Sequence, residues 1–160
     1  MESFLSDLDA WMWRYRDAGS NYAGVHFTAR PSACRGLLRA RDVMTKWPGP
    51  TQRQIPLKRL EKKNLRRVAA GDWYPHHDFD LLKLRLQPAS ESLQQMHLRT
   101  ANREVELTFT ELFVGELSEG LESVAQDGGD FSVAPCQDLG PLGALDRASL
   151  ELWFWPCFEP

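Results

Sequence analysis

The fold is decided by residues 93–126, which read LQQMHLRTANREVELTFTELFVGELSEGLESVAQ. The segments 93–100 and 103–110 have the composition and spacing of strands that keep one face buried. Asn102 lies between them, and asparagine tolerates the left-handed backbone of a tight turn. This stretch therefore predicts two paired strands, joined at Ala101 and Asn102, that lead directly into the element after Thr110.

That next element is predicted to be a helix over 111–126. Thr110 suits the N-cap, and Glu111 is favourable in the first turn. The apolar positions recur at helical spacing, at Phe113, Leu117, Leu121 and Val124. The opposite side carries the acidic residues Glu111, Glu116, Glu119 and Glu122. Gly115 and Gly120 each weaken a helix by about 1 kcal/mol relative to alanine, so tertiary packing has to hold it.

The rest of the chain predicts an α+β protein. Two more helices are expected, over 3–17 and 31–46; the first rests on apolar residues at helical spacing, which are Phe4, Leu8, Trp11, Met12 and Tyr15. Further strands are expected over 23–28, 54–60, 82–86, 130–134 and 149–156, and a loop over 71–78. Pro56 restricts its strand to a sheet edge. Together these predict a single domain over 1–160, with a mostly antiparallel sheet of about five to seven strands and three helices.

The distribution of charge is the most informative property of the sequence. The net charge is only −3 over 160 residues. Residues 30–67, however, hold twelve basic and two acidic side chains, whereas residues 101–160 hold twelve acidic and two basic ones. Segregated charge of this kind either neutralises itself within the fold or forms separate binding faces.

The composition indicates a globular, cytoplasmic protein. The hydrophobic share of 42% and the charged share of 26% are near the averages for folded domains. The first residues, MESFLSD, are acidic and lack the apolar core of a signal peptide. The longest apolar run is far shorter than the roughly 20 residues that cross a bilayer, so no membrane partner is expected.

A protein partner is the leading functional hypothesis. The acidic helix over 111–126 would meet a basic protein surface, such as that of a nuclease, in the manner of an immunity protein or antitoxin. Trp153 and Trp155 form a second candidate partner-binding site, because tryptophans often anchor interfaces. No catalytic residue is nominated: the chain has no G-x-S-x-G elbow, P-loop or dinucleotide fingerprint.

Two alternatives remain open from the sequence. The string YPHHDFD, residues 74–80, offers His76, His77, Asp78 and Asp80 as metal ligands for a small metal-dependent enzyme or metal-binding protein. Adjacent side chains of an extended segment point to opposite sides, so no cofactor is expected unless other residues complete the set. The basic stretch 53–67 would suit nucleic acid by charge, although it contains no aromatic residue on which bases could stack.

Overall fold

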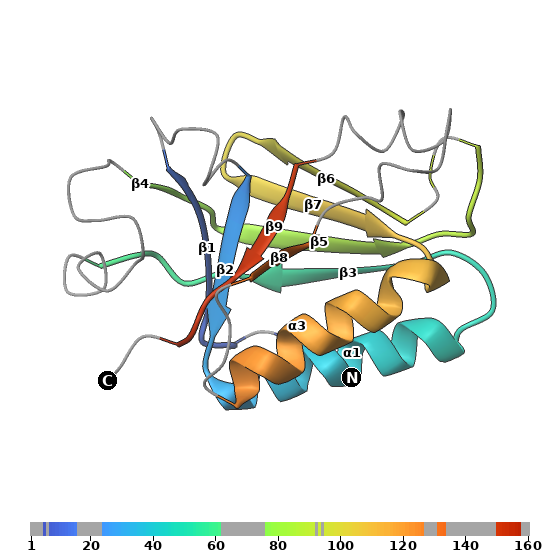
Figure 1. Cartoon of the computed structure of the whole chain (residues 1–160), viewed down its shortest axis with the longest axis horizontal. Helices are drawn as coiled ribbons and strands as arrows, with labels where there is room; N and C mark the ends of the chain where they lie inside the picture. The colour runs from blue at the N-terminus through green and yellow to red at the C-terminus, as the bar shows by residue number, and fades with distance from the viewer. Residues whose placement is uncertain are drawn as a thin grey trace.

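The computed structural model describes residues 5, 7–15, 24–61, 76–91, 93, 95–126, 131–133 and 150–157, and all structural statements concern these residues. Within them the chain forms two mixed sheets, two α-helices and a short 3-10 helix (Figure 1). The helices are α1 (Pro31–Lys46), η3 (Glu111–Phe113) and α3 (Val114–Ala125). Neither described α-helix combines the length and the apolar character that crossing a membrane requires.

The first sheet has five strands in the order β4-β1-β2-β9-β8. Their bounds are β4 (His76–Asp78), β1 (Ala10–Tyr15), β2 (Val25–Ala29), β9 (Leu152–Phe154) and β8 (Phe131–Val133). β9 pairs with β2 in parallel, whereas the other neighbours are antiparallel. The C-terminal strand is thereby placed beside one from the start of the chain.

The second sheet has four strands in the order β3-β5-β7-β6. Their bounds are β3 (Thr51–Pro56), β5 (Leu81–Leu86), β7 (Glu104–Phe109) and β6 (Met96–Ala101). β5 and β7 run parallel at its centre, and the outer pairs are antiparallel. β3 is an edge strand, which is where Pro56 can be tolerated because proline has no N–H to donate.

The α+β class is confirmed, but the predicted single, mostly antiparallel sheet with three helices is wrong in detail. There are two mixed sheets, each with a parallel pair, and two α-helices in the described chain. The parallel pairs join strands that are distant in sequence. Strand periodicity shows which face of a strand is buried, but it does not show which strand lies beside it.

The predicted N-terminal helix over 3–17 is also wrong, because residues 10–15 form strand β1 between β4 and β2. Ala10 and Met12 face the main core, and Trp11, Trp13 and Tyr15 pack in a second cluster on the other face. Both faces are therefore apolar, and the alternation of polar and apolar residues that marks a half-exposed strand is lost. In a helix Trp13 would lie on the side opposite the apolar residues, so its size and apolar character were the available signal against a helix.

Several local predictions are confirmed. The helices over 31–46 and 111–126 form, as α1 and as η3 followed by α3. β6 and β7 pair across the predicted turn, where Asn102 has a φ of 55°.

The predicted loop over 71–78 is instead strand β4 over its last three residues, and residues 71–75 lie outside the described chain.

The main core fills the space between the helix pair and the two sheets. Figure 1 shows α1 and α3 side by side along one side of the sheets. Leu37 from α1 and Leu117 from α3 meet Met12 and Phe27 of the first sheet and Leu84 of the second. This packing leaves the outer side of α3 exposed.

Candidate functional site

Helix α3 directs its glutamates to solvent because its apolar side is held in the core. Leu117, Gly120, Leu121 and Val124 are buried. In η3, which leads into α3, the Thr110 Oγ1 accepts a hydrogen bond from the Leu112 N–H at 3.3 Å, as the sequence predicts for an N-cap. The acidic side of the helix therefore faces away from both sheets.

We call Glu111, Glu116, Glu119 and Glu122 the acidic face. All four residues are exposed. Within the described part of the chain, none of their carboxylates forms an ion pair with a lysine or arginine. Like charges three residues apart on a helix repel each other by about 0.2–0.5 kcal/mol per pair. The acidic face is thus a concentration of negative charge that these residues do not neutralise.

Other acidic side chains from the same part of the sequence are neutralised on the second sheet. Lys83 Nζ lies 2.8 Å from Glu104 Oε2. Glu106 is paired with Arg85 at 3.4 Å and with Arg99 at 2.8 Å. These carboxylates form ion pairs between neighbouring strands of the second sheet, so they are not part of the candidate site.

A hollow of about 410 Å³ lies at the N-terminal end of α3, and we call it the Trp47 hollow. It is lined by Thr45, Trp47, Gly49, Leu86, Gln87, Pro88, Ala89, Thr110, Glu111 and Leu112. Trp47 is 63% exposed and Leu112 is 60% exposed. Figure 1 shows the segments that form it meeting at one end of the molecule, where α1 ends and α3 begins. Two large apolar side chains are therefore exposed at the same hollow.

The sequence pattern alone does not mark Trp47 or Leu112 as functional residues. The run Trp47-Pro48-Gly49-Pro50 has the composition of a turn that ends a helix. Two features of the sequence were available as signals. Trp47 lies beyond the apolar stripe of the preceding helix, and the following Pro48 keeps the backbone of Trp47 out of the helical conformation. For Leu112 the sequence carries no comparable signal.

The predicted partner-binding tryptophans, Trp153 and Trp155, belong to an aromatic cluster on the first sheet. Trp155 is buried with 8% exposure, and its Nε1–H donates to Nδ1 of His26 at 2.8 Å. The rings of Trp153 and Trp155 stack on each other and on His26, with centroids about 6 Å apart. Trp13 and Tyr15 complete the surroundings of this buried histidine. Trp155 is therefore a packing residue, and Trp153 is half-buried beside it.

The two carboxylates among the predicted metal ligands, Asp78 and Asp80, are bound by an arginine. The Arg103 guanidinium donates to Asp80 at 2.6 and 3.1 Å and to Asp78 at 3.0 Å. These hydrogen bonds and the positive charge lower the pKa of Asp80 below its ordinary value. Within the described residues no three histidine, cysteine, aspartate or glutamate side chains are grouped to hold a metal ion.

The one described histidine side chain of that string, His77, is directed to a different partner from the carboxylates. His77 Nε2 lies 3.2 Å from the backbone oxygen of Asn102, in the turn between β6 and β7. The side chain of His76 lies outside the described part of the structure. A cation beside Asp78 and Asp80 would have to displace the Arg103 guanidinium, so this arrangement favours a structural role for the pair.

The basic stretch 53–67 is described only as far as residue 61. Lys58 Nζ lies 3.1 Å from Asp7 and 3.5 Å from Asp9, and these carboxylates raise the pKa of Lys58. Arg59 lies 3.6 Å from Asp80. Lys62, Lys63, Arg66 and Arg67 lie outside the described residues. Two of the described cations are thus already paired with acidic residues.

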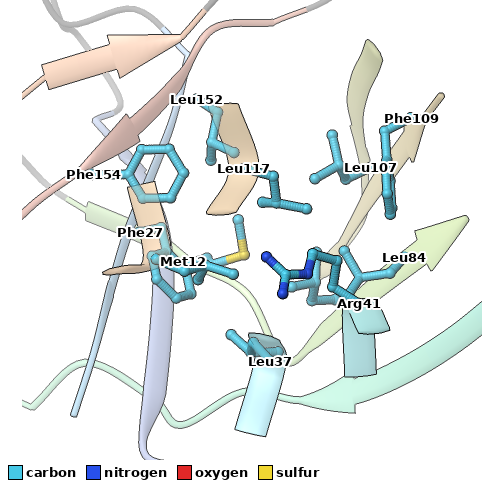
Figure 2. A pocket seen from close by; sticks show the side chains of 12 residues that line it. Met12, Phe27, Leu37, Arg41, Leu84, Leu107, Phe109, Leu117, Leu152 and Phe154 are labelled. Atoms are coloured by element: carbon cyan, nitrogen blue, oxygen red, sulfur yellow. The ribbon is translucent and has the colours of Figure 1, made fainter. Parts of the chain in front are cut away.

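A second, smaller cavity of about 30 Å³ lies inside the main core. Its lining is apolar apart from Arg41, and Figure 2 shows the guanidinium turned in among the core side chains. The guanidinium is hydrogen bonded to Ser118 on α3 and to Asp42. A space of this size holds little more than a water molecule, so it is a packing gap at the α1–α3 seam.

Comparisons with protein-family models, with curated protein sequences and with solved structures find no match to this chain. The acidic face and the Trp47 hollow are therefore the two candidate functional surfaces of the described chain.

Proposed function

We propose that this chain is a non-catalytic protein-binding domain that docks on a basic protein through the acidic face of α3. The observation that carries the proposal is that four exposed glutamates follow one another along η3 and α3 without a cation to neutralise them in the described chain. Surfaces of opposite charge attract over several ångströms and accelerate encounter, which is the advantage such a face gives.

Two features of these glutamates are unfavourable for the isolated chain. Glu116, Glu119 and Glu122 are spaced three residues apart, so neighbouring carboxylates repel. Glu122 also lies in the last turn of α3, where the negative end of the helix dipole disfavours a carboxylate. A basic partner relieves both penalties when it binds, and that relief contributes to affinity.

We further propose that the partner is a nuclease-like protein and that binding inhibits it. Proteins that bind nucleic acid present lysine and arginine side chains to phosphate. An acidic helix that occupies such a surface competes directly with the nucleic acid. The class of function is then that of an immunity protein or antitoxin, which requires no catalytic group in this chain.

The test is the association rate with the partner recovered by co-purification from the native source. Neutralising the acidic face with Glu116→Gln, Glu119→Gln and Glu122→Gln should lower the association rate about tenfold at low salt, because the steering charge is removed. The unmodified chain should also block cleavage of nucleic acid by the recovered partner.

A matched control changes three carboxylates that are already paired. Asp7→Asn, Asp9→Asn and Glu104→Gln alter the net charge equally but remove acids that contact Lys58 and Lys83. This variant should associate at nearly the rate of the unmodified chain. Equal effects of the two triple variants would show that only net charge matters, and an unchanged rate in both would refute docking through α3.

A further inference from the structure

We infer that the Trp47 hollow is the anchor pocket of this interface and takes one apolar side chain from a basic segment of the partner. The inference rests on the proposed function, because the partner is the same one that the acidic face attracts. It adds what the charge alone does not supply, namely a place where binding energy is concentrated and a preference for one kind of sequence in the partner.

The apolar content of the hollow supports this assignment. Trp47 and Leu112 both line it and are each more than half exposed, and Leu86, Pro88 and Ala89 contribute further lining. The volume of about 410 Å³ falls in the range of about 300–1,000 Å³ that is usual for ligand pockets. Tryptophan is one of the residue types most enriched among those that dominate binding energy at interfaces.

The walls of the hollow are held in place before any partner arrives. Trp47 precedes Pro48, and this restricts its backbone to the extended conformation that it adopts, with φ −79° and ψ 133°. On the other side, the Gln87 N–H donates to Phe109 O at 3.0 Å and the Thr110 N–H donates to Gln95 O at 2.9 Å. A preformed pocket loses little conformational entropy on binding, so more of the contact energy appears as affinity.

Charge decides what kind of segment fits. Glu111 is the only charged residue in the described lining of the hollow, and it is also the first member of the acidic face. A segment whose apolar side chain enters the hollow therefore places its flanking residues against glutamates. Lysine or arginine at those flanking positions complements them, whereas an acidic segment is repelled.

Two synthetic peptides test this directly. One is a short lysine-rich peptide with a single central leucine, and the other has serine in place of the leucine. The leucine peptide should bind the unmodified chain about tenfold more tightly than the serine peptide, measured by titration calorimetry, because its apolar side chain is removed from water on binding. Trp47→Ala and Leu112→Ala should each reduce this preference at least about threefold, with folding unchanged because both side chains are exposed.

Val43→Ala is the matched control. Val43 is 42% exposed on α1, but it does not line the hollow, and its truncation should leave the preference intact. If both peptides bind equally and salt weakens both, the acidic face is the binding surface and the hollow is not an anchor. If neither peptide binds at low salt, the proposed partner chemistry is wrong for both features. A leucine preference that survives both alanine variants would place the apolar contact elsewhere.

Discussion

Gly115 and Gly120 lie in the same helix, but their surroundings differ. A Cβ added at Gly115 would meet no atom within 4 Å. A Cβ added at Gly120 would lie 2.4–2.6 Å from ring atoms of Phe154, which is buried in strand β9. Gly115 therefore only weakens the helix, whereas Gly120 permits the close approach of α3 to the first sheet.

We expect Gly115→Ala to raise the free energy of unfolding by about 0.5–1 kcal/mol, because alanine loses less backbone entropy in a helix. Gly120→Ala should lower it by about 1–3 kcal/mol, because the buried ring of Phe154 has to move. Chemical denaturation of both variants measures the difference, and each serves as the control for the other. Changes of the same sign would contradict the packing of Phe154 on α3.

The buried thiol of Cys34 illustrates how burial removes reactivity at a single residue. Desolvation is the main cause that raises its pKa to about 12, so the nucleophilic thiolate is scarce at neutral pH. Cys34 lies on the core side of α1 with the other buried residues of that helix. It contributes to packing as a small apolar residue.

At the scale of elements, Arg103 connects parts of the chain that are far apart in sequence. Arg103 lies in the turn between β6 and β7, and its two partners, Asp78 and Asp80, lie at the end of β4 and just before β5. Asp78 in turn accepts a hydrogen bond from the Leu60 N–H at 3.0 Å. The β6–β7 turn of the second sheet is thereby tied to the edge strand β4 of the first.

This connection should make stability depend on pH in acid. The pKa of Asp80 is lower in the folded chain than its ordinary value of 3.8, so the unfolded state binds more protons as the pH falls. The contribution is fully present above about pH 4 and is lost as the pH falls through the folded pKa. In Arg103→Met the free energy of unfolding should fall less steeply as the pH is lowered below about 4. Denaturation at a series of pH values measures this dependence.

Arg35→Met is the control for this prediction, because it also removes one exposed positive charge but lies on α1. It should leave the pH dependence of the unmodified chain in place. If Arg103→Met and Arg35→Met gave the same profile, the ion pairs of Arg103 would not be the source of the acid sensitivity.

At the scale of the whole molecule, the charge segregation of the sequence is only partly cancelled by the fold. Early cations such as Arg30 and Lys58 pair with Asp7 and Asp9. Late acids on the second sheet pair with strand cations. The carboxylates of α3 remain unneutralised within the described chain, so the folded domain presents a strongly negative helix on its exterior.

If this helix is kept acidic for binding, its neutralisation should make the isolated domain more stable. The double variant Glu119→Gln, Glu122→Gln removes the repulsion between Glu116 and Glu119 and between Glu119 and Glu122. It also removes an unfavourable carboxylate near the helix C-terminus. We expect the free energy of unfolding to rise by about 0.5–1 kcal/mol at low salt, while association with the basic partner slows. A loss of stability would show instead that these glutamates have stabilising partners.

The sequence predicted the elements whose exposed and buried sides differ in polarity. This property is shared by the two helices, 31–46 and 111–126, and by the two strands on either side of Asn102. All four elements form. Strand β1 is apolar on both faces, and its prediction as a helix was wrong for that reason. The acidic face could be located from sequence because helical periodicity places residues on one side of a helix without reference to the rest of the fold.

By itself, then, the sequence determined the local conformations and the segregation of charge along the chain, because both depend on residues close together in sequence. Only the tertiary structure decided that β9 lies beside β2, that Asp78 and Asp80 belong to Arg103, and that Trp155 is buried against His26. The Trp47 hollow also exists only in the folded chain, since its lining comes from segments up to 67 residues apart. Contacts of this kind depend on which surfaces pack together, which periodicity in one segment does not specify.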